Sequence, residues 1–206
     1  MIRFTRVKPP GGAGKRYFLD DDGSLRSTGV PVLGSGKFAT VRATDIRNLI
    51  ERIDELLEPG HVVLWATAPK KKGRIAPQGH KDEDALVRSP TVFARREDIG
   101  VVALDYDPAP GMPAITRRQY VRLLRRAGLT GDLALRESTS SLIYSTDGRM
   151  LKGPGGLRAL GAVRPATMIP RLIDDLMVRG WLAGSGHIRV SDNGRALGNG
   201  GAKLCQ

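Results

Sequence analysis

Amphipathic helical segments alternate with short β-type runs along this chain, and this alternation restricts the fold class. Apolar side chains recur at helical spacing in three segments: 44–57, 116–127 and 168–182. Between and after them lie apolar runs of strand length: 62–66, 101–104, 133–135, 142–144 and 187–191. Strands interleaved with helices predict an α/β or α+β fold in which helices cover at least one face of a sheet.

Capping residues predict where the first two helices begin. Thr44 is a suitable N-cap for the first helix, which Pro59 and Gly60 end, and Thr116 is a suitable N-cap for the second. The first forty residues are punctuated by glycines and are interpreted as short strands or loops. A hairpin is predicted there, with one strand at 16–19, a turn at 20–23 and a return at Leu25.

Residues 68–98 lack clear periodicity. This segment holds eight Lys or Arg and five Asp or Glu residues. Strong charge without an apolar repeat is typical of solvent-exposed chain, so the sequence predicts an exposed loop, with a short strand around Val92 and Phe93.

Composition limits the cellular setting and the chemistry. The 206 residues contain 33 Lys plus Arg against 21 Asp plus Glu, and a single Cys. Cys205 alone can form neither a disulfide framework nor a zinc cluster, so a reducing compartment is expected. No run of about 18 apolar residues and no apolar signal core occurs. The sequence therefore predicts a cytoplasmic protein without a membrane partner, folded as a single module over residues 1–206.

The net charge of +12 indicates a polyanionic partner, and nucleic acid is the first candidate. The alternative is a solvated, arginine-rich surface that reflects a GC-rich genome. Basic residues gather at 70–74 and again at the second predicted helix. Candidate DNA-binding residues of that helix are Arg117, Arg118, Arg122, Arg125 and Arg126. Offsets of four place Arg118, Arg122 and Arg126 on one side of it.

Asp105 and Asp107 follow the apolar run 101–104 at the end of a predicted strand. Their i, i+2 spacing directs both carboxylates to one face of the sheet. Carboxylate oxygens are preferred ligands of Mg²⁺ and Mn²⁺, and two such ions assist phosphoryl transfer. The two residues are therefore the candidate metal-binding and catalytic acids. The alternative is a strand end with two solvated carboxylates.

Candidate phosphate-binding residues follow in two short segments. Hydroxyl side chains lie at Ser138, Ser140 and Ser141, and cationic side chains at Lys152 and Arg158 flank a glycine-rich turn. Glycine allows a backbone to approach phosphate closely, while serine and basic side chains donate hydrogen bonds to it. The alternative is that these are ordinary surface loops.

The order of four motifs resembles a known family. These motifs are Val101–Pro108, Ser138–Tyr144, Gly155–Arg158 and Arg179–Ser191. In this order they resemble the archaeo-eukaryotic primase superfamily, in particular the primase-polymerase module of plasmid, phage and integrative-element replication proteins. The resemblance covers roughly residues 95–197.

The resemblance implies a two-lobed α+β module with a mixed sheet related to the RNA-recognition fold. Its parts would be an N-terminal part at 1–98, a motif-bearing part at 99–197 and a tail at 198–206. It implies nucleotidyl transfer on a DNA template with nucleoside triphosphates, a replicative helicase as a partner, and Asp105 and Asp107 as ligands of catalytic Mg²⁺ or Mn²⁺. It further implies that Ser138, Ser140 and Ser141 precede the nucleotide-binding turn. Arg158 stands where many members have a phosphate-contacting histidine.

One departure from the family concerns catalysis. The family has a third carboxylate after the strand that matches 187–191, and this chain offers only Asp192 there. Weak polymerase activity, or a truncated, split or relict form, is therefore expected. The alternative function is a non-catalytic basic DNA-binding or replication-accessory module. A remoter one is a metal-dependent nucleotidyltransferase or glycosyltransferase that uses the aspartate-x-aspartate pair.

Overall fold

The computed structural model describes residues 1–11, 15–29, 35–56, 60–79, 83–108, 114–137, 143–153 and 155–184. These residues form an α+β fold with several sheets and three α-helices, in agreement with the predicted fold class. The chain divides into two compact units, the first made of 1–102 and 162–167 and the second of 103–161 and 168–206. No helix within the described ranges is both long and apolar enough to cross a membrane.

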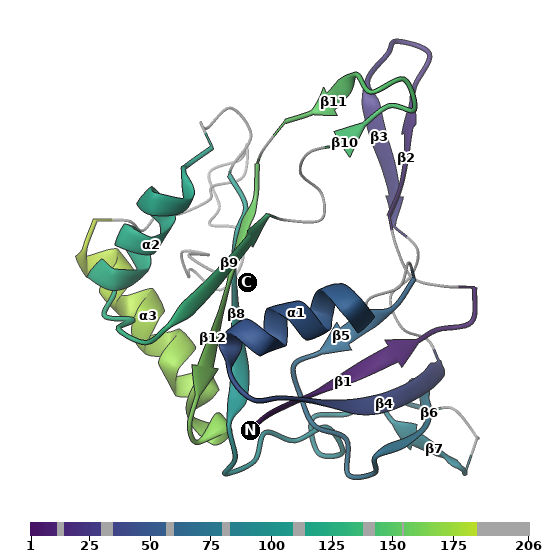
Figure 1. The fold of residues 1–206 in the computed structure, drawn as a ribbon, viewed down its shortest axis with the longest axis vertical. Coiled ribbons are helices and arrows are strands. Elements are labelled where there is room, and N and C mark those ends of the chain that lie inside the picture. The colour runs from purple at the N-terminus through teal and green to yellow at the C-terminus, as the bar shows by residue number, and fades with distance from the viewer. Residues whose placement is uncertain are drawn as a thin grey trace, which may run out of the picture. The chain divides into compact units, whose positions relative to one another are not determined.

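A five-stranded sheet is the centre of the first unit (Figure 1). Its order is β5-β1-β4-β6-β7. The strands are β1 (Ile2–Lys8), β4 (Gly36–Ala43), β5 (Val62–Leu64), β6 (Lys72–Ala76) and β7 (Ala85–Val87). All neighbours pair antiparallel except β6 and β7, which are parallel, so the sheet is mixed.

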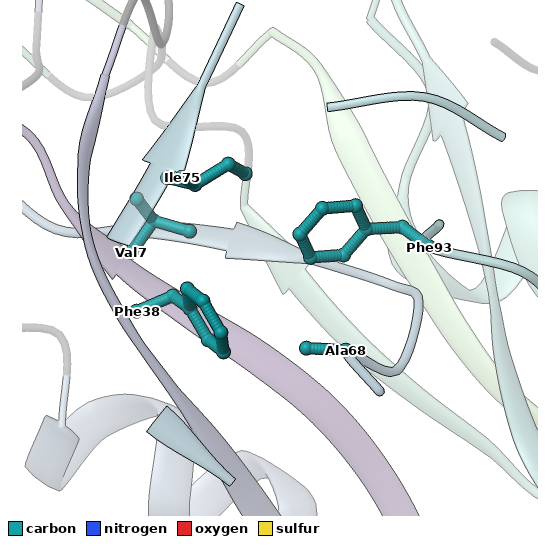
Figure 2. Close-up of a cluster of buried hydrophobic side chains, with 5 residues drawn as sticks. All are labelled: Val7, Phe38, Ala68, Ile75 and Phe93. Carbon is teal, nitrogen blue, oxygen red and sulfur yellow. The ribbon is translucent and has the colours of Figure 1, made fainter. Parts of the chain in front are cut away.

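One face of this sheet is covered by a hydrophobic cluster. Figure 2 shows its members, Val7, Phe38, Ala68, Ile75 and Phe93, of which Val7 is fully buried. The rings of Phe38 and Phe93 meet edge to face with centroids 6.2 Å apart, a favourable aromatic geometry. The alternation of side chains along β1, β4 and β6 directs these apolar residues to one side and leaves the other side for different neighbours.

The opposite face is partly covered by α1 (Ile46–Leu56), which packs against β1 and β4 (Figure 1). Leu49 and Ile53 are buried one helical turn apart. The predicted helix is confirmed, but the predicted cap is wrong by one residue. The backbone N–H of Asn48 donates to the carboxylate of Asp45 at 2.8 Å, so Asp45 is the N-cap, and the Thr44 hydroxyl donates to the same carboxylate.

Two strand predictions in the first unit need correction. β6 and β7 lie inside segment 68–98, which was predicted to be an exposed loop, while Val92 and Phe93 lie in a turn. In the β6 sequence Lys-Gly-Arg-Ile-Ala, Lys72 and Arg74 are two residues apart and share an exposed face. Their charges hide the alternation of apolar residues that would identify a strand. β1 and β4 are full strands within the first forty-three residues. The predicted hairpin is confirmed as β2 (Lys15–Leu19) and β3 (Leu25–Gly29), which pair antiparallel.

The second unit contains a three-stranded sheet of order β8-β12-β9. These strands are β8 (Gly100–Tyr106), β12 (Leu157–Val163) and β9 (Leu133–Glu137). β8 begins in the first unit, to which residues 100–102 belong, and β12 ends there, at residues 162–163. A separate two-stranded sheet consists of β10 (Ile143–Tyr144) and β11 (Met150–Lys152).

Two helices of the second unit confirm the periodicity predictions. They are α2 (Arg117–Arg126) and α3 (Ile169–Leu182), which pack against each other (Figure 1). Thr116 caps α2 as predicted, in a capping box with Gln119, and a 3₁₀ turn at Ala166–Met168 precedes α3. The strand predicted at 187–191 lies outside the described residues.

Candidate functional site

Asp105 and Arg158 form a two-fold hydrogen-bonded ion pair between adjacent strands. Asp105 lies near the end of β8, and Arg158 is the second residue of β12, which neighbours β8 in the sheet. Arg158 Nε donates to Asp105 Oδ1 at 2.5 Å, and Arg158 Nη2 donates to Asp105 Oδ2 at 2.9 Å. This fork geometry is the strongest arrangement that guanidinium and carboxylate groups form. Two residues far apart in the sequence, both predicted to act on a nucleotide, are therefore in contact.

Asp107 adds a second negative charge to this pair. Its side chain is exposed, directly beyond the end of β8. The hydrogen bonds that Arg158 donates to Asp105 raise the pKa of the Arg158 guanidinium, and the charges of Asp105 and Asp107 raise it further, against the opposing effect of burial. Both acids therefore stabilise the positive charge of Arg158.

The alternation of side chains along β8 places the ion pair on one face of the sheet. Leu104 and Tyr106 face α2, because the Tyr120 hydroxyl of α2 donates to the Leu104 carbonyl at 2.9 Å and the rings of Tyr106 and Tyr120 are 5.7 Å apart. Asp105, between them, points to the opposite face. Arg136 of β9 lies directly opposite Arg158 and shares its face. An acid and two cations thus lie across three adjacent strands.

Tyr120 fixes α2 on the strand that carries the acids. It is fully buried, and its ring packs on Tyr106, while burial raises the pKa of the Tyr106 hydroxyl. The sequence contains a signal for this residue, because Tyr120 lies four residues before Leu124, which is also buried, and so belongs to the apolar face of the helix.

Replacing Tyr120 with phenylalanine is expected to lower the free energy of unfolding by about 1 kcal/mol, because a buried hydrogen bond to the Leu104 carbonyl is lost while packing remains. Urea unfolding of the two proteins measures the difference. Gln119→Ala, which removes half of the capping box at the exposed helix end, provides a comparison on the same helix. An unchanged unfolding midpoint for Tyr120→Phe would show that this hydrogen bond does not stabilise the strand.

The five arginines of α2 differ in their surroundings. Arg117 pairs with Glu137 of β9 at 3.0 Å, and Arg125 donates to the Leu129 carbonyl at 2.8 Å. Arg118 is exposed. Arg122 and Arg126 line an open cavity of about 290 Å³ that also contains Tyr106, Ile115, Gln119 and Leu123. Because Tyr106 and Asp105 point to opposite faces of β8, this cavity lies across the sheet from the ion pair.

Lys152 lies on an element separate from the sheet that carries the ion pair, and the predicted serines cannot be placed because they lie outside the described residues. Lys152 is exposed and ends β11, which belongs to the separate two-stranded sheet and pairs with β10. Ser138, Ser140 and Ser141 lie outside the described residues, as does Asp192. The contact between Asp105 and Arg158 is therefore what the structure adds to the predicted site residues.

The chemistry of the donors fits a divalent cation. Ionised carboxylates offer about four lone-pair sites each, and Arg158 takes only two of those on Asp105. Asp107 is exposed. Asp105 and Asp107 can therefore both contribute oxygen ligands, the type that Mg²⁺ and Mn²⁺ prefer, with water completing the shell. Within the ranges that the structure describes, no group of three His, Cys, Asp or Glu side chains is positioned to hold a metal ion.

Comparisons with known proteins return no similarity: no protein-family model, no curated protein and no solved structure matches this chain.

Proposed function

We propose that this chain is a primase-polymerase-like nucleotidyltransferase of a mobile-element replication system, which uses nucleoside triphosphates on a DNA template with Mg²⁺ or Mn²⁺. The observation that carries the proposal is the contact of Arg158 with Asp105, beside Asp107. It joins the acidic motif to the basic residue of the glycine-rich turn, two segments that are 53 positions apart.

The Arg158 guanidinium is suited to a phosphate group. Its planar fork binds phosphate oxygens in the same two-fold manner in which it binds the Asp105 carboxylate. In the proposed complex a triphosphate oxygen replaces Asp105 on this fork, and Asp105 is released to act with Asp107 on a cation. A cation bound there would help to deprotonate the attacking hydroxyl and to neutralise the leaving group.

The surrounding sheet keeps these groups in a defined position. Leu104 and Ala159, on the two strands that carry the acids and Arg158, are buried, and Tyr120 holds β8 from the opposite face. Sites on packed strands hold reactive groups more accurately than sites on loops do. Asp105 and Arg158 are themselves half-buried, so they remain accessible to a nucleotide.

The proposal is tested by incubating the purified protein with a single-stranded DNA template, labelled nucleoside triphosphates and either Mg²⁺ or Mn²⁺. Template-dependent extension products that need the divalent cation are expected. Products that persist in EDTA, or that do not depend on template, would contradict the proposal. Parallel reactions with ribonucleotides and deoxyribonucleotides identify the preferred sugar.

A second candidate is a non-catalytic DNA-binding module. It is favoured by the same ion pair, because both oxygens of Asp105 are already held by Arg158. In that case the pair is a structural link between β8 and β12. DNA binding would then persist when both partners are exchanged for neutral residues, and no extension product would form under any metal condition.

A further inference from the structure

We propose that the α1-side face of the five-stranded sheet binds the phosphate backbone of nucleic acid through a cluster of five basic residues. The cluster, here called the basic sheet face, consists of Arg6 and Lys8 on β1, Lys37 on β4, and Lys72 and Arg74 on β6. It lies in the first unit, on elements separate from Asp105 and Arg158.

The strand registers place these five residues in two rows. Lys8 lies opposite Lys37, and Lys37 lies opposite Arg74, so three cations follow one another across three adjacent strands. The second row lies two residues further along each strand. In it, Arg6 is opposite Ala39, and Ala39 is opposite Lys72. Residues opposite each other, and residues two apart on a strand, share a face. All five side chains therefore lie on one side of the sheet.

Burial along this face shows that its basic end is open. On β1, Ile2 and Phe4 are buried, Arg6 is partly buried and Lys8 is exposed. On β4, Ala43 is buried and Lys37 is exposed. On β1 and β4, exposure thus increases from Ile2 and Ala43 toward Lys8 and Lys37. The opposite face of the same strands is filled by the cluster of Val7, Phe38 and Ile75 (Figure 2), so only the basic side can receive a ligand.

The position of the lysine run is fixed by hydrogen bonds. The backbone N–H of Thr40 on β4 donates to the Lys71 carbonyl at 2.7 Å, and the Thr40 hydroxyl donates to the Lys70 carbonyl at 3.2 Å. Lys70 and Lys71 are both exposed and lead directly into Lys72. These bonds fix the backbone that leads directly into Lys72 on β6.

Lys37 has a basic residue opposite it on each neighbouring strand, Lys8 on β1 and Arg74 on β6. Spacings of about 5 Å between strands and about 7 Å along them distribute the cations over a surface that phosphate groups can follow.

Nucleic acid fits this face better than a membrane does. Surface binding to a bilayer combines basic residues with apolar side chains that enter the interface. None of the large exposed apolar side chains of the described residues lies on the strands that carry the basic residues. The strands of this face therefore offer charge without a large exposed apolar anchor, which indicates contact with the phosphate backbone.

The test is a salt titration of binding to a fluorescent duplex of random sequence, for the full chain and for Lys37→Gln/Lys72→Gln. Each phosphate contact contributes about eightfold to affinity at 0.1 M salt by counterion release, so the double variant is expected to bind about 60-fold more weakly. The slope of log affinity against log salt should fall by about two. Both replaced lysines are exposed, so the variant should unfold at about the same temperature as the parent chain.

Arg95→Gln/Arg96→Gln is the matched control, since it removes the same charge from exposed positions next to Phe93 of the opposite face. The proposal is overturned if both double variants lose affinity equally, if neither slope changes, or if the lysines affect binding to anionic vesicles but not to DNA.

A third variant separates this inference from the proposed function. Asp105→Asn/Asp107→Asn should retain the duplex affinity and salt slope of the parent chain even where nucleotidyl transfer is lost. Binding that depends on these acids and not on the lysines would overturn the basic sheet face and leave the catalytic proposal standing.

Discussion

Replacing Asp105 and Asp107 together by asparagine is expected to lower nucleotidyl transfer by roughly a thousandfold or more, a size of loss that follows removal of groups acting directly at the reacting atoms. Asparagine has nearly the shape of aspartate but carries no negative charge, so it is a poor ligand for Mg²⁺ or Mn²⁺. The rate of template-dependent extension at saturating nucleotide measures the loss. Single variants should each lose most of the activity, because the two acids act as one unit.

The same replacement also removes the ion pair with Arg158, and this effect on folding is expected to be small. Arg158 has 38% of its side chain exposed and Asp105 29%, so solvent screens the pair and its loss lowers stability by about 1 kcal/mol. Asp174→Asn/Asp175→Asn on α3 changes the charge of the second unit equally, at exposed positions. Equal activity in the two double variants would contradict a catalytic role for Asp105 and Asp107.

Arg158→Ala is expected to have two opposite effects. Without nucleotide, it should raise the affinity for Mn²⁺ by about tenfold, because a positive charge in contact with Asp105 is removed. With Mn²⁺ present, it should weaken nucleoside triphosphate binding by about 10- to 100-fold, because charge-assisted hydrogen bonds to phosphate are lost. Manganese titration followed by electron paramagnetic resonance, and calorimetry with nucleotide, measure the two affinities.

Arg158→Lys is the informative comparison for that variant. Lysine retains the charge but cannot form the two-fold hydrogen bond of the guanidinium fork. It should keep the low Mn²⁺ affinity and recover only part of the nucleotide affinity. If Arg158→Ala weakens neither ligand, Arg158 serves only to join β12 to Asp105, and the non-catalytic candidate is favoured.

Local patterns predicted α2, α3, β8, β9 and β10 of the second unit, but not β12, whose residue Arg158 was predicted at a glycine-rich turn. Thr116 and the apolar spacing around Leu124 defined α2, and the run 101–104 located the strand that ends at the acids. In each of these segments, the buried apolar residues and a neighbouring capping or charged residue indicate the same end of the helix or strand. Such signals are contained in about a dozen neighbouring residues and do not depend on the rest of the fold.

The charged strand β6 could not be found in this way. Its buried residues Ile75 and Ala76 follow Lys72 and Arg74, which face the open side of the sheet. A strand that is buried on one face and basic on the other resembles a charged loop when its neighbours are unknown. The basic sheet face is therefore visible only once β1, β4 and β6 are aligned by register, although residues 70–74 already stood out by charge.

The pairing of Asp105 with Arg158 also depends on topology. The two residues were both identified as site candidates, but only the adjacency of β8 and β12 brings them together. Likewise, Arg118, Arg122 and Arg126 were predicted on one side of α2, yet Arg122 and Arg126 line a cavity on the side of β8 that faces away from Asp105. Contacts of this range are set by strand order, which local periodicity does not encode.

The central claim is that Asp105 and Asp107 bind a divalent cation together with a triphosphate held by Arg158. It is tested most directly by electron paramagnetic resonance titration of Mn²⁺ into the protein with and without a non-hydrolysable nucleoside triphosphate. We expect Mn²⁺ to bind more tightly when the nucleotide is present, and this gain to vanish in Asp105→Asn/Asp107→Asn but not in Asp174→Asn/Asp175→Asn. Mn²⁺ binding that is the same in all three proteins would contradict the claim.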